Sequence, residues 1–118
     1  MGEKPVVERG SRNAVEGEPN VRLDPRSSEE IGKTLKQVLE PIKDQLLSRE
    51  ELIGLKNWLN AHKGSLLARK IISEGAWCYG RPVGGDAPCL NWYGGGFGVV
   101  SSWLVYGWSS NDRAAFRG

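Results

Sequence analysis

Residues 94–108 read GGGFGVVSSWLVYGW, and this stretch decides the fold because it combines glycine, aromatic and β-branched residues without a single charge. It lies inside a longer run, from Ala87 to Asn111, that also has no charged side chain. A stretch of this composition is either buried in protein, inserted at a membrane interface or prone to aggregate. The preceding part of the chain is mostly polar, so the place of this run determines both the fold class and the function.

Insertion into a membrane interface is the first interpretation. The run is long enough to cross a bilayer, which takes about 20 apolar residues, but its glycine and polar residues favour shallow insertion instead. Trp and Tyr rings are typical of the headgroup boundary. The residues expected to contact the bilayer are Trp92, Tyr93, Phe97, Val99, Val100, Trp103, Leu104, Val105, Tyr106 and Trp108. Basic residues expected to contact anionic lipid or a partner are Lys63, Arg69, Lys70, Arg113 and Arg117.

The alternative is that residues 76–118 form strands packed on helices. Residues 77–79, 89–93 and 97–108 are rich in types that suit a pleated surface, and residues 81–86 are typical of a hairpin connection. Apolar and polar residues do not alternate over residues 99–105, so a strand there needs cover on both faces. This interpretation predicts a small α+β domain with C-terminal antiparallel strands.

Helix signals fill the middle of the chain. Ser27 and Glu30 have the spacing of a capping box, and an apolar stripe follows over residues 31–46. Pro41 interrupts that stripe and predicts a break near Glu40.

A second and a third helix are expected further along. Ser48 and Glu51 repeat the capping-box spacing and predict a second helix that ends near residues 63–64. Ser65 predicts the start of a short third helix, and Gly75 its end.

Composition limits the remaining choices. The 118 residues suffice for one small domain, and a formal net charge of +2 does not favour a nucleic-acid binder. Residues 1–26 are polar and rich in Pro and Gly, which predicts a disordered arm. The expected organisation is therefore a disordered arm over residues 1–26, a helical region over residues 27–75 and an apolar tail over residues 76–118.

No residue pattern points to catalysis, a metal or a cofactor. The cysteines Cys78 and Cys89 flank a Gly- and Pro-rich segment, so a disulfide between them is sterically accessible, although buried thiols are the commoner role. His62 is the only histidine, and with two cysteines it does not complete a four-ligand zinc site. Residues 94–98 lack the lysine and the flanking pattern of a phosphate-binding loop.

These observations favour a mainly α, non-enzymatic protein whose Gly/aromatic tail inserts in or perturbs a lipid bilayer. Its helical region is expected to be cytoplasmic, because the N-terminus has no apolar segment typical of a signal peptide, and to bind a protein partner or a second copy. One alternative function is a cytoplasmic α+β protein–protein interaction domain with the tail as its core. A less favoured alternative is a precursor that is cut after Gly84-Gly85 to release an antimicrobial peptide.

Overall fold

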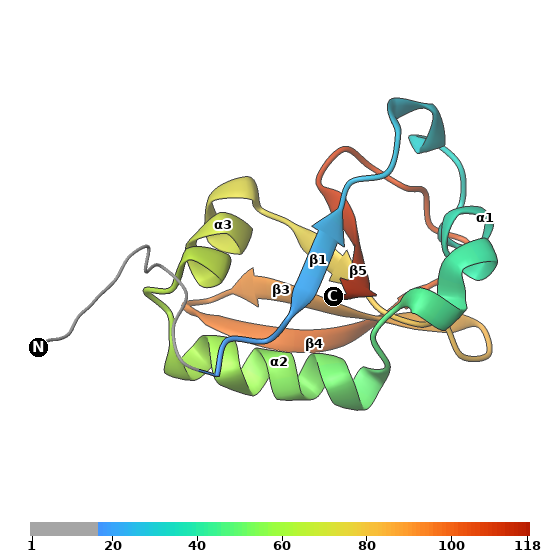
Figure 1. Cartoon of the computed structure of the whole chain (residues 1–118). Coiled ribbons are helices and arrows are strands. Elements are labelled where there is room, and N and C mark those ends of the chain that lie inside the picture. Colours follow the sequence, from blue (N-terminus) through green and yellow to red (C-terminus); the bar gives the residue numbers. More distant parts are fainter. Residues whose placement is uncertain (1–16) are drawn as a thin grey trace, which may run out of the picture.

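The computed structural model describes residues 17–118 of the chain (Figure 1). Its helical elements are η1 (Ser28–Glu30), α1 (Leu35–Leu39), η2 (Glu40–Gln45), α2 (Arg49–Ala61) and α3 (Leu66–Glu74), where η marks a 3-10 helix. Its strands are β1 (Val21–Asp24), β2 (Trp77–Tyr79), β3 (Asp86–Tyr93), β4 (Gly96–Trp103) and β5 (Asp112–Arg117). The five strands form one sheet in the order β1-β5-β2-β3-β4. Neighbouring strands are antiparallel except for the parallel pair β2 and β5.

The prediction of a mainly α fold is wrong, and the α+β alternative is confirmed. The apolar tail supplies four of the five strands instead of forming a separate segment. Gly94 and Gly95 connect β3 to β4 as a two-residue turn, both with positive φ, at 66° and 87°. A turn of this kind matches the twist of a tight hairpin, and glycine adopts it without strain. Gly94 and Gly95 therefore form the turn of a hairpin, and Gly96 begins its second strand.

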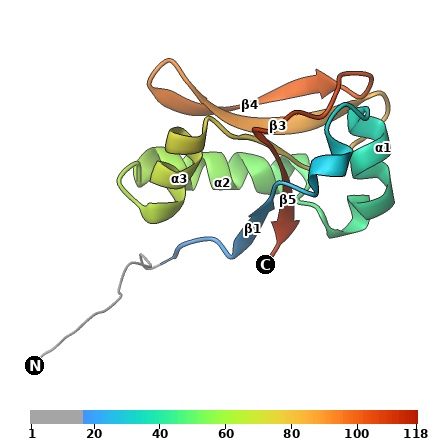
Figure 2. The same ribbon diagram turned by 90° about the horizontal axis from the view of Figure 1, so that it is seen from above.

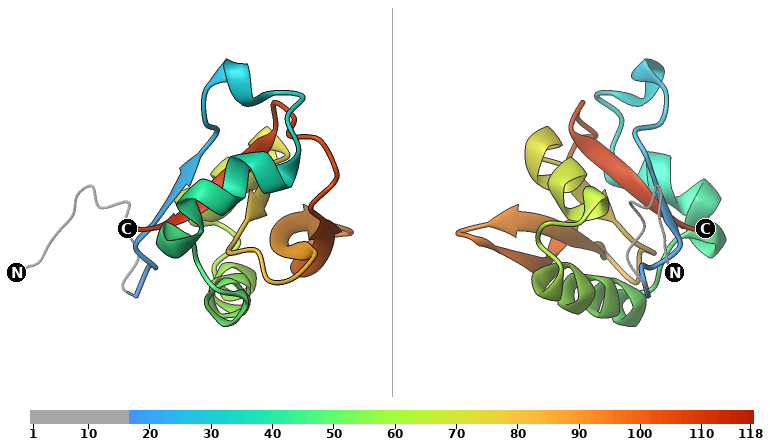
Figure 3. Two further views of the ribbon diagram at one scale, coloured as in Figure 1. Left: turned by 90° about the vertical axis from the view of Figure 1, so that its right-hand side faces the viewer. Right: turned by 60° about the vertical axis from the view of Figure 1, so that its left-hand side comes forward.

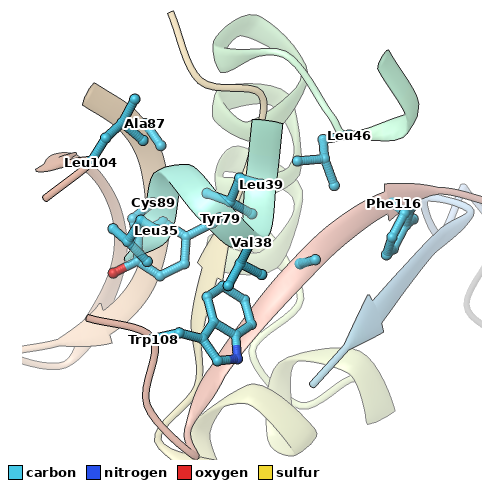
Figure 4. Packing of buried hydrophobic residues seen from close by; sticks show 11 residues of the cluster. Leu35, Val38, Leu39, Leu46, Tyr79, Ala87, Cys89, Leu104, Trp108 and Phe116 are labelled. Carbon is cyan, nitrogen blue, oxygen red and sulfur yellow. The ribbon is translucent and has the colours of Figure 1, made fainter. Parts of the chain in front are cut away.

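Apolar side chains lie on both faces of the sheet. Figure 2 shows α1 on the opposite side of the molecule from α3. On one face, Leu35, Val38 and Leu39 of α1 pack against Tyr79 and other buried residues (Figure 4). The opposite face is covered by α2 and α3, through buried residues of both helices. The central strands β2, β3 and β5 bury side chains on both faces, which explains why their sequences lack a strict apolar–polar alternation.

Residues 99–105, in contrast, are not one strand covered on both faces. The strand β4 ends at Trp103, and the chain then turns, with the Tyr106 N–H donating to the Trp103 carbonyl at 3.1 Å. Val99 packs toward α2, whereas Val100 on the other face is 44% exposed. The missing alternation in this stretch therefore reflects a turn and not a doubly covered strand.

The helix signals of the sequence are partly confirmed. Ser48 and Glu51 form the expected capping box at the start of α2, and Ser65 caps α3, which ends at Gly75 in the left-handed conformation. The break at Pro41 is confirmed too, because α1 ends at Leu39 and η2 follows it.

The predicted helix start at Ser27 is wrong. Ser27 makes no side-chain cap and precedes only the short turn η1. Thr34 instead caps α1 through a capping box with Gln37. Gln37 takes the place that glutamate usually has in a capping box. The sequence signal for the start of α1 is therefore the spacing Thr-x-x-Gln, which the sequence analysis did not use.

Part of the expected disordered arm is ordered. Residues 21–24 form β1, which pairs with β5 at the C-terminal end of the chain. The pairing places Arg22 opposite Phe116, with the guanidinium 4.2 Å from the ring centroid. Residues 1–16 of the expected arm lie outside the described residues.

A substitution at Trp108 tests whether the tail is part of the hydrophobic core. Its side chain is 2% exposed, and its Nε1–H donates to the Pro25 carbonyl at 3.3 Å. We expect Trp108→Ala to lower the free energy of unfolding by about 3–5 kcal/mol, because it leaves a large cavity. Trp103→Ala, at a side chain that is 66% exposed, should cost less than about 1 kcal/mol. Urea unfolding followed by circular dichroism measures both, and equal effects would contradict this packing.

Candidate interaction surface

The residues predicted to contact a bilayer do not form one surface. Phe97, Leu104 and Trp108 are buried, at 5%, 5% and 2% exposure. Tyr93 is 85% exposed and lies at the β3–β4 turn, whereas Trp103 lies at the opposite end of β4. Trp92 and Val99 are half-buried against the α2 side of the sheet.

Four exposed large apolar side chains come from the backbone segments that meet at one end of the hairpin. We call this group the apolar end, and it consists of Val83, Trp103, Val105 and Tyr106, which are 73%, 66%, 75% and 57% exposed. Two loops meet here, because the Leu104 N–H donates to the Gly85 carbonyl at 3.0 Å and Trp103 pairs with Asp86. Exposed apolar surface is a feature of protein interaction sites.

The backbone around the apolar end is held rigidly. The start of α1 donates two hydrogen bonds to this loop, from Leu35 N–H to the Tyr106 carbonyl at 2.8 Å and from Lys36 N–H to the Leu104 carbonyl at 3.1 Å. The Trp108 N–H donates to the Lys33 carbonyl at 2.7 Å. The exposed rings are therefore presented on a fixed backbone, which reduces the entropy lost when they bind.

The strand β4 is an edge strand among the described residues. In an antiparallel ladder the N–H and C=O of one residue point to the same side, and successive residues alternate. The bond from Leu104 to Gly85 shows that even-numbered residues of β4 face β3. The backbone groups of Phe97, Val99, Ser101 and Trp103 consequently face outward.

The α2 residue Asn60 closes one end of this edge. Its side-chain amide donates to the Phe97 carbonyl at 3.0 Å, and its side-chain oxygen accepts from the Phe97 N–H at 2.9 Å. Asn60 thereby replaces a neighbouring strand at Phe97. At the other end the Trp103 carbonyl accepts from Tyr106 within the turn.

Between these two ends the edge is open. Within residues 17–118, the N–H groups of Val99, Ser101 and Trp103 and the carbonyls of Val99 and Ser101 have no hydrogen-bond partner. Proteins usually protect such edges with charges, prolines or bulges. The opposite edge strand β1 is short, has charged Arg22 and Asp24, and is followed by Pro25. The segment 99–103 has none of these features.

One side of α2 runs along the open edge (Figure 3). We use the name edge stripe for Arg49, Ile53, Lys56 and Asn60 on this side of α2 together with Lys63, which follows the helix. Steps of three and four residues place the four helical residues on one side of α2. The two ends of the edge stripe are fixed by Arg49, which donates to Ser101 Oγ at 2.8 Å, and by Lys63, which donates to the Gly95 carbonyl at 3.1 Å.

The edge stripe is positively charged. Arg49, Lys56 and Lys63 contribute three cationic groups, and none of them has an ion-pair partner among residues 17–118. The strands β3 and β4 contain one acidic residue, Asp86, which pairs with Trp103. Ile53, 38% exposed, adds an apolar surface between the charges.

Most basic residues predicted to contact lipid are used within the fold. Arg117 makes two hydrogen bonds to the Glu51 carboxylate, at 2.9 and 3.3 Å. The backbone N–H of Ser48, which donates to Glu51 in the capping box, and then the guanidinium of Arg117 hold the pKa of Glu51 below its usual value. Lys70 and Arg113 both pair with Glu74. Of the predicted set, Arg69 is exposed on α3, and Lys63 belongs to the edge stripe.

The two cysteines are free and buried. They lie on neighbouring strands, but Cys78 belongs to the α2–α3 side of the sheet and Cys89 to the α1 side. No disulfide joins them in this structure, because their side chains lie on opposite faces. Burial raises the pKa of Cys78 to about 12 and also raises the pKa of Cys89, so both stay protonated thiols at neutral pH.

The described residues provide few other candidates. Within residues 17–118 there is no pocket and no cluster of His, Cys, Asp and Glu side chains that suits a metal ion. No helix among them has the length and apolar composition needed to span a membrane. His62 follows α2 and stacks on Trp58, with ring centroids 4.2 Å apart, as part of the packing at that helix end.

The edge stripe was not predicted from the sequence. Arg49, Lys56 and Asn60 have helical spacing there, but nothing in the sequence indicates that this side of the helix faces a strand edge. Only the contact of Asn60 with Phe97 shows the role of this residue.

Amide hydrogen exchange tests the assignment of the edge. We expect the amides of Val99 and Ser101 to exchange quickly, and those of Val100 and Ser102 to exchange slowly through their bonds to β3. Phe97 should be slow in the wild type and faster in Asn60→Ala. NMR measurements on the free protein resolve each amide, and uniform protection along β4 would contradict the open edge.

Thiol titration tests the state of the cysteines. We expect neither Cys78 nor Cys89 to react with a soluble disulfide reagent in the native protein, because both are buried and protonated. Both should react once the chain is unfolded in guanidinium without reductant. Absence of reaction in the unfolded chain would indicate a disulfide instead.

Comparison of the chain with models of protein families, with curated proteins and with solved structures finds no match.

Proposed function

We propose that this chain is a protein–protein interaction domain that binds a partner protein through its apolar end. The observation that supports the proposal most directly is the group Val83, Trp103, Val105 and Tyr106, exposed together on a rigid backbone. Trp and Tyr are enriched among residues that contribute most to protein interfaces. The partner surface is expected to be apolar at its centre.

The arrangement of the tail favours a protein over a bilayer as the partner. A segment that inserts in a membrane uses its apolar residues together, whereas here Phe97, Leu104 and Trp108 are buried in the core. The exposed Tyr93 lies at the turn of the hairpin, whereas Trp103 and Tyr106 lie at its opposite end. Lipid binding through the tail stays a prediction, and it is the competing outcome of the experiment below.

The experiment compares the wild type with a double variant, Trp103→Ser with Tyr106→Ser, and with a control, Tyr93→Ser. Each purified chain is used to capture proteins from an extract of the source cells, and each captured protein is then purified and its Kd measured by calorimetry. We expect at least one partner to bind the wild type and the control equally, and the double variant about tenfold or more weakly. All three substitutions are at exposed side chains, so circular dichroism should be unchanged.

Two results would contradict the proposal. One is that no purified partner distinguishes the double variant from the control. The other is that the wild type floats with phosphatidylcholine–phosphatidylglycerol vesicles while the double variant does not, which would support lipid binding through the same residues.

A further inference from the structure

From the open edge of β4 and the charge of the edge stripe, we infer that the partner binds as an added strand and that the added segment is acidic. This inference rests on the proposed function, since it names the chemistry of the segment that binds next to the apolar end. In strand addition, the hydrogen bonds of the main chain provide affinity and alternate side chains provide specificity.

The open part of the edge has defined limits. Asn60 occupies the outward groups of Phe97 at one end, and the turn at Trp103 closes the other. Between them, the N–H and C=O groups of Val99 and Ser101 and the N–H of Trp103 face outward without a partner among the described residues. A short extended segment therefore pairs with this part of the edge, with one of its ends beside the apolar end.

The side chains on the two faces of the edge specify the pattern of the segment. On the α2 face, an added residue meets Arg49, Ile53 and Lys56 of the edge stripe. On the other face it meets Val100, which is 44% exposed. Because successive residues of a strand point to opposite faces, the fitting segment alternates acidic residues with β-branched or aromatic ones.

Charge favours this occupant over a second copy of the chain. Antiparallel pairing of two β4 strands within these limits centres on Ser101. Arg49, which donates to Ser101 Oγ, would then meet the same arginine of the other copy next to the two-fold axis. The repulsion between the two arginines opposes pairing of two copies. The carboxylates of an acidic segment, in contrast, would be attracted to Arg49.

The test starts from phage-displayed random dodecapeptides selected on the immobilised full chain. We expect the selected peptides to have acidic residues in alternate positions and to contain no proline within the pairing segment. NMR of the complex should show slower exchange at the amides of Val99, Ser101 and Trp103. Binding should weaken as the salt concentration rises, because the charged groups are exposed to solvent.

Backbone pairing is tested on the peptide itself. Methylating the alternate amide nitrogens that face β4 should abolish binding, whereas methylating the other alternate set should leave it nearly unchanged. A peptide that binds only through its side chains would tolerate both sets. Equal tolerance of the two sets would overturn strand addition.

Charge is tested on the protein. We expect Arg49→Glu with Lys56→Glu to weaken peptide binding about tenfold or more. The matched control is Arg69→Glu, at an exposed arginine of α3, a helix that packs against β3. All three positions are exposed or half-buried, and circular dichroism establishes that the variants fold. Equal binding by the charge variant and the control would overturn the acidic partner.

Failure of strand addition is distinguishable from failure of the proposed function. If selected peptides lose affinity with Trp103→Ser and Tyr106→Ser but tolerate methylation, the apolar end binds proteins and the added strand is wrong. A different result is that no peptide is selected, light scattering shows a dimer, and Ser101→Pro dissociates that dimer. A second copy then occupies the edge, and the inference of an acidic segment is wrong. If peptide binding depends on none of these residues, both proposals fail.

Discussion

Simultaneous burial of both faces of the sheet is the constraint on which the rest of this structure depends. The strands β2, β3 and β5 have apolar side chains on both faces, so helices must cover each side. On the α1 side the cover is short, because α1 contains five residues. The segment 104–108 completes it by placing Leu104 and Trp108 in the same core as Leu35. The tail thus supplies four strands of the sheet and also part of the segment that covers one of its faces.

This cover also determines which apolar residues stay exposed. Leu104 and Trp108 point into the core, and the residues between them, Val105 and Tyr106, are consequently turned outward. Hydrogen bonds from the start of α1 prevent the loop from rearranging to bury them. The exposed group at the apolar end follows from the packing of its neighbours, and its rigidity suits it to binding.

The edge stripe has a similar origin. The helix α2 buries Leu52, Leu55 and Leu59 against the sheet, and the same rotation about its axis places Asn60 and Arg49 at the edge of β4. Asn60 satisfies the outward groups of Phe97, whereas the edge farther along has no such side chain within the described residues. One end of the edge strand is thereby closed by the protein itself, and the remainder is open to a partner.

The sequence by itself determined the local features of this protein. Capping at Ser48 and Ser65, the stop at Gly75 and the break at Pro41 depend on hydrogen bonds and sterics within a few residues. Only the tertiary structure decided that the tail is core, that residues 21–24 pair with β5, and that Arg49, Lys56 and Asn60 face a strand edge. These features depend on contacts between residues far apart in the chain. A segment rich in glycine, tryptophan and valine has the same composition whether it forms a sheet or lies at a membrane, so composition does not distinguish the two.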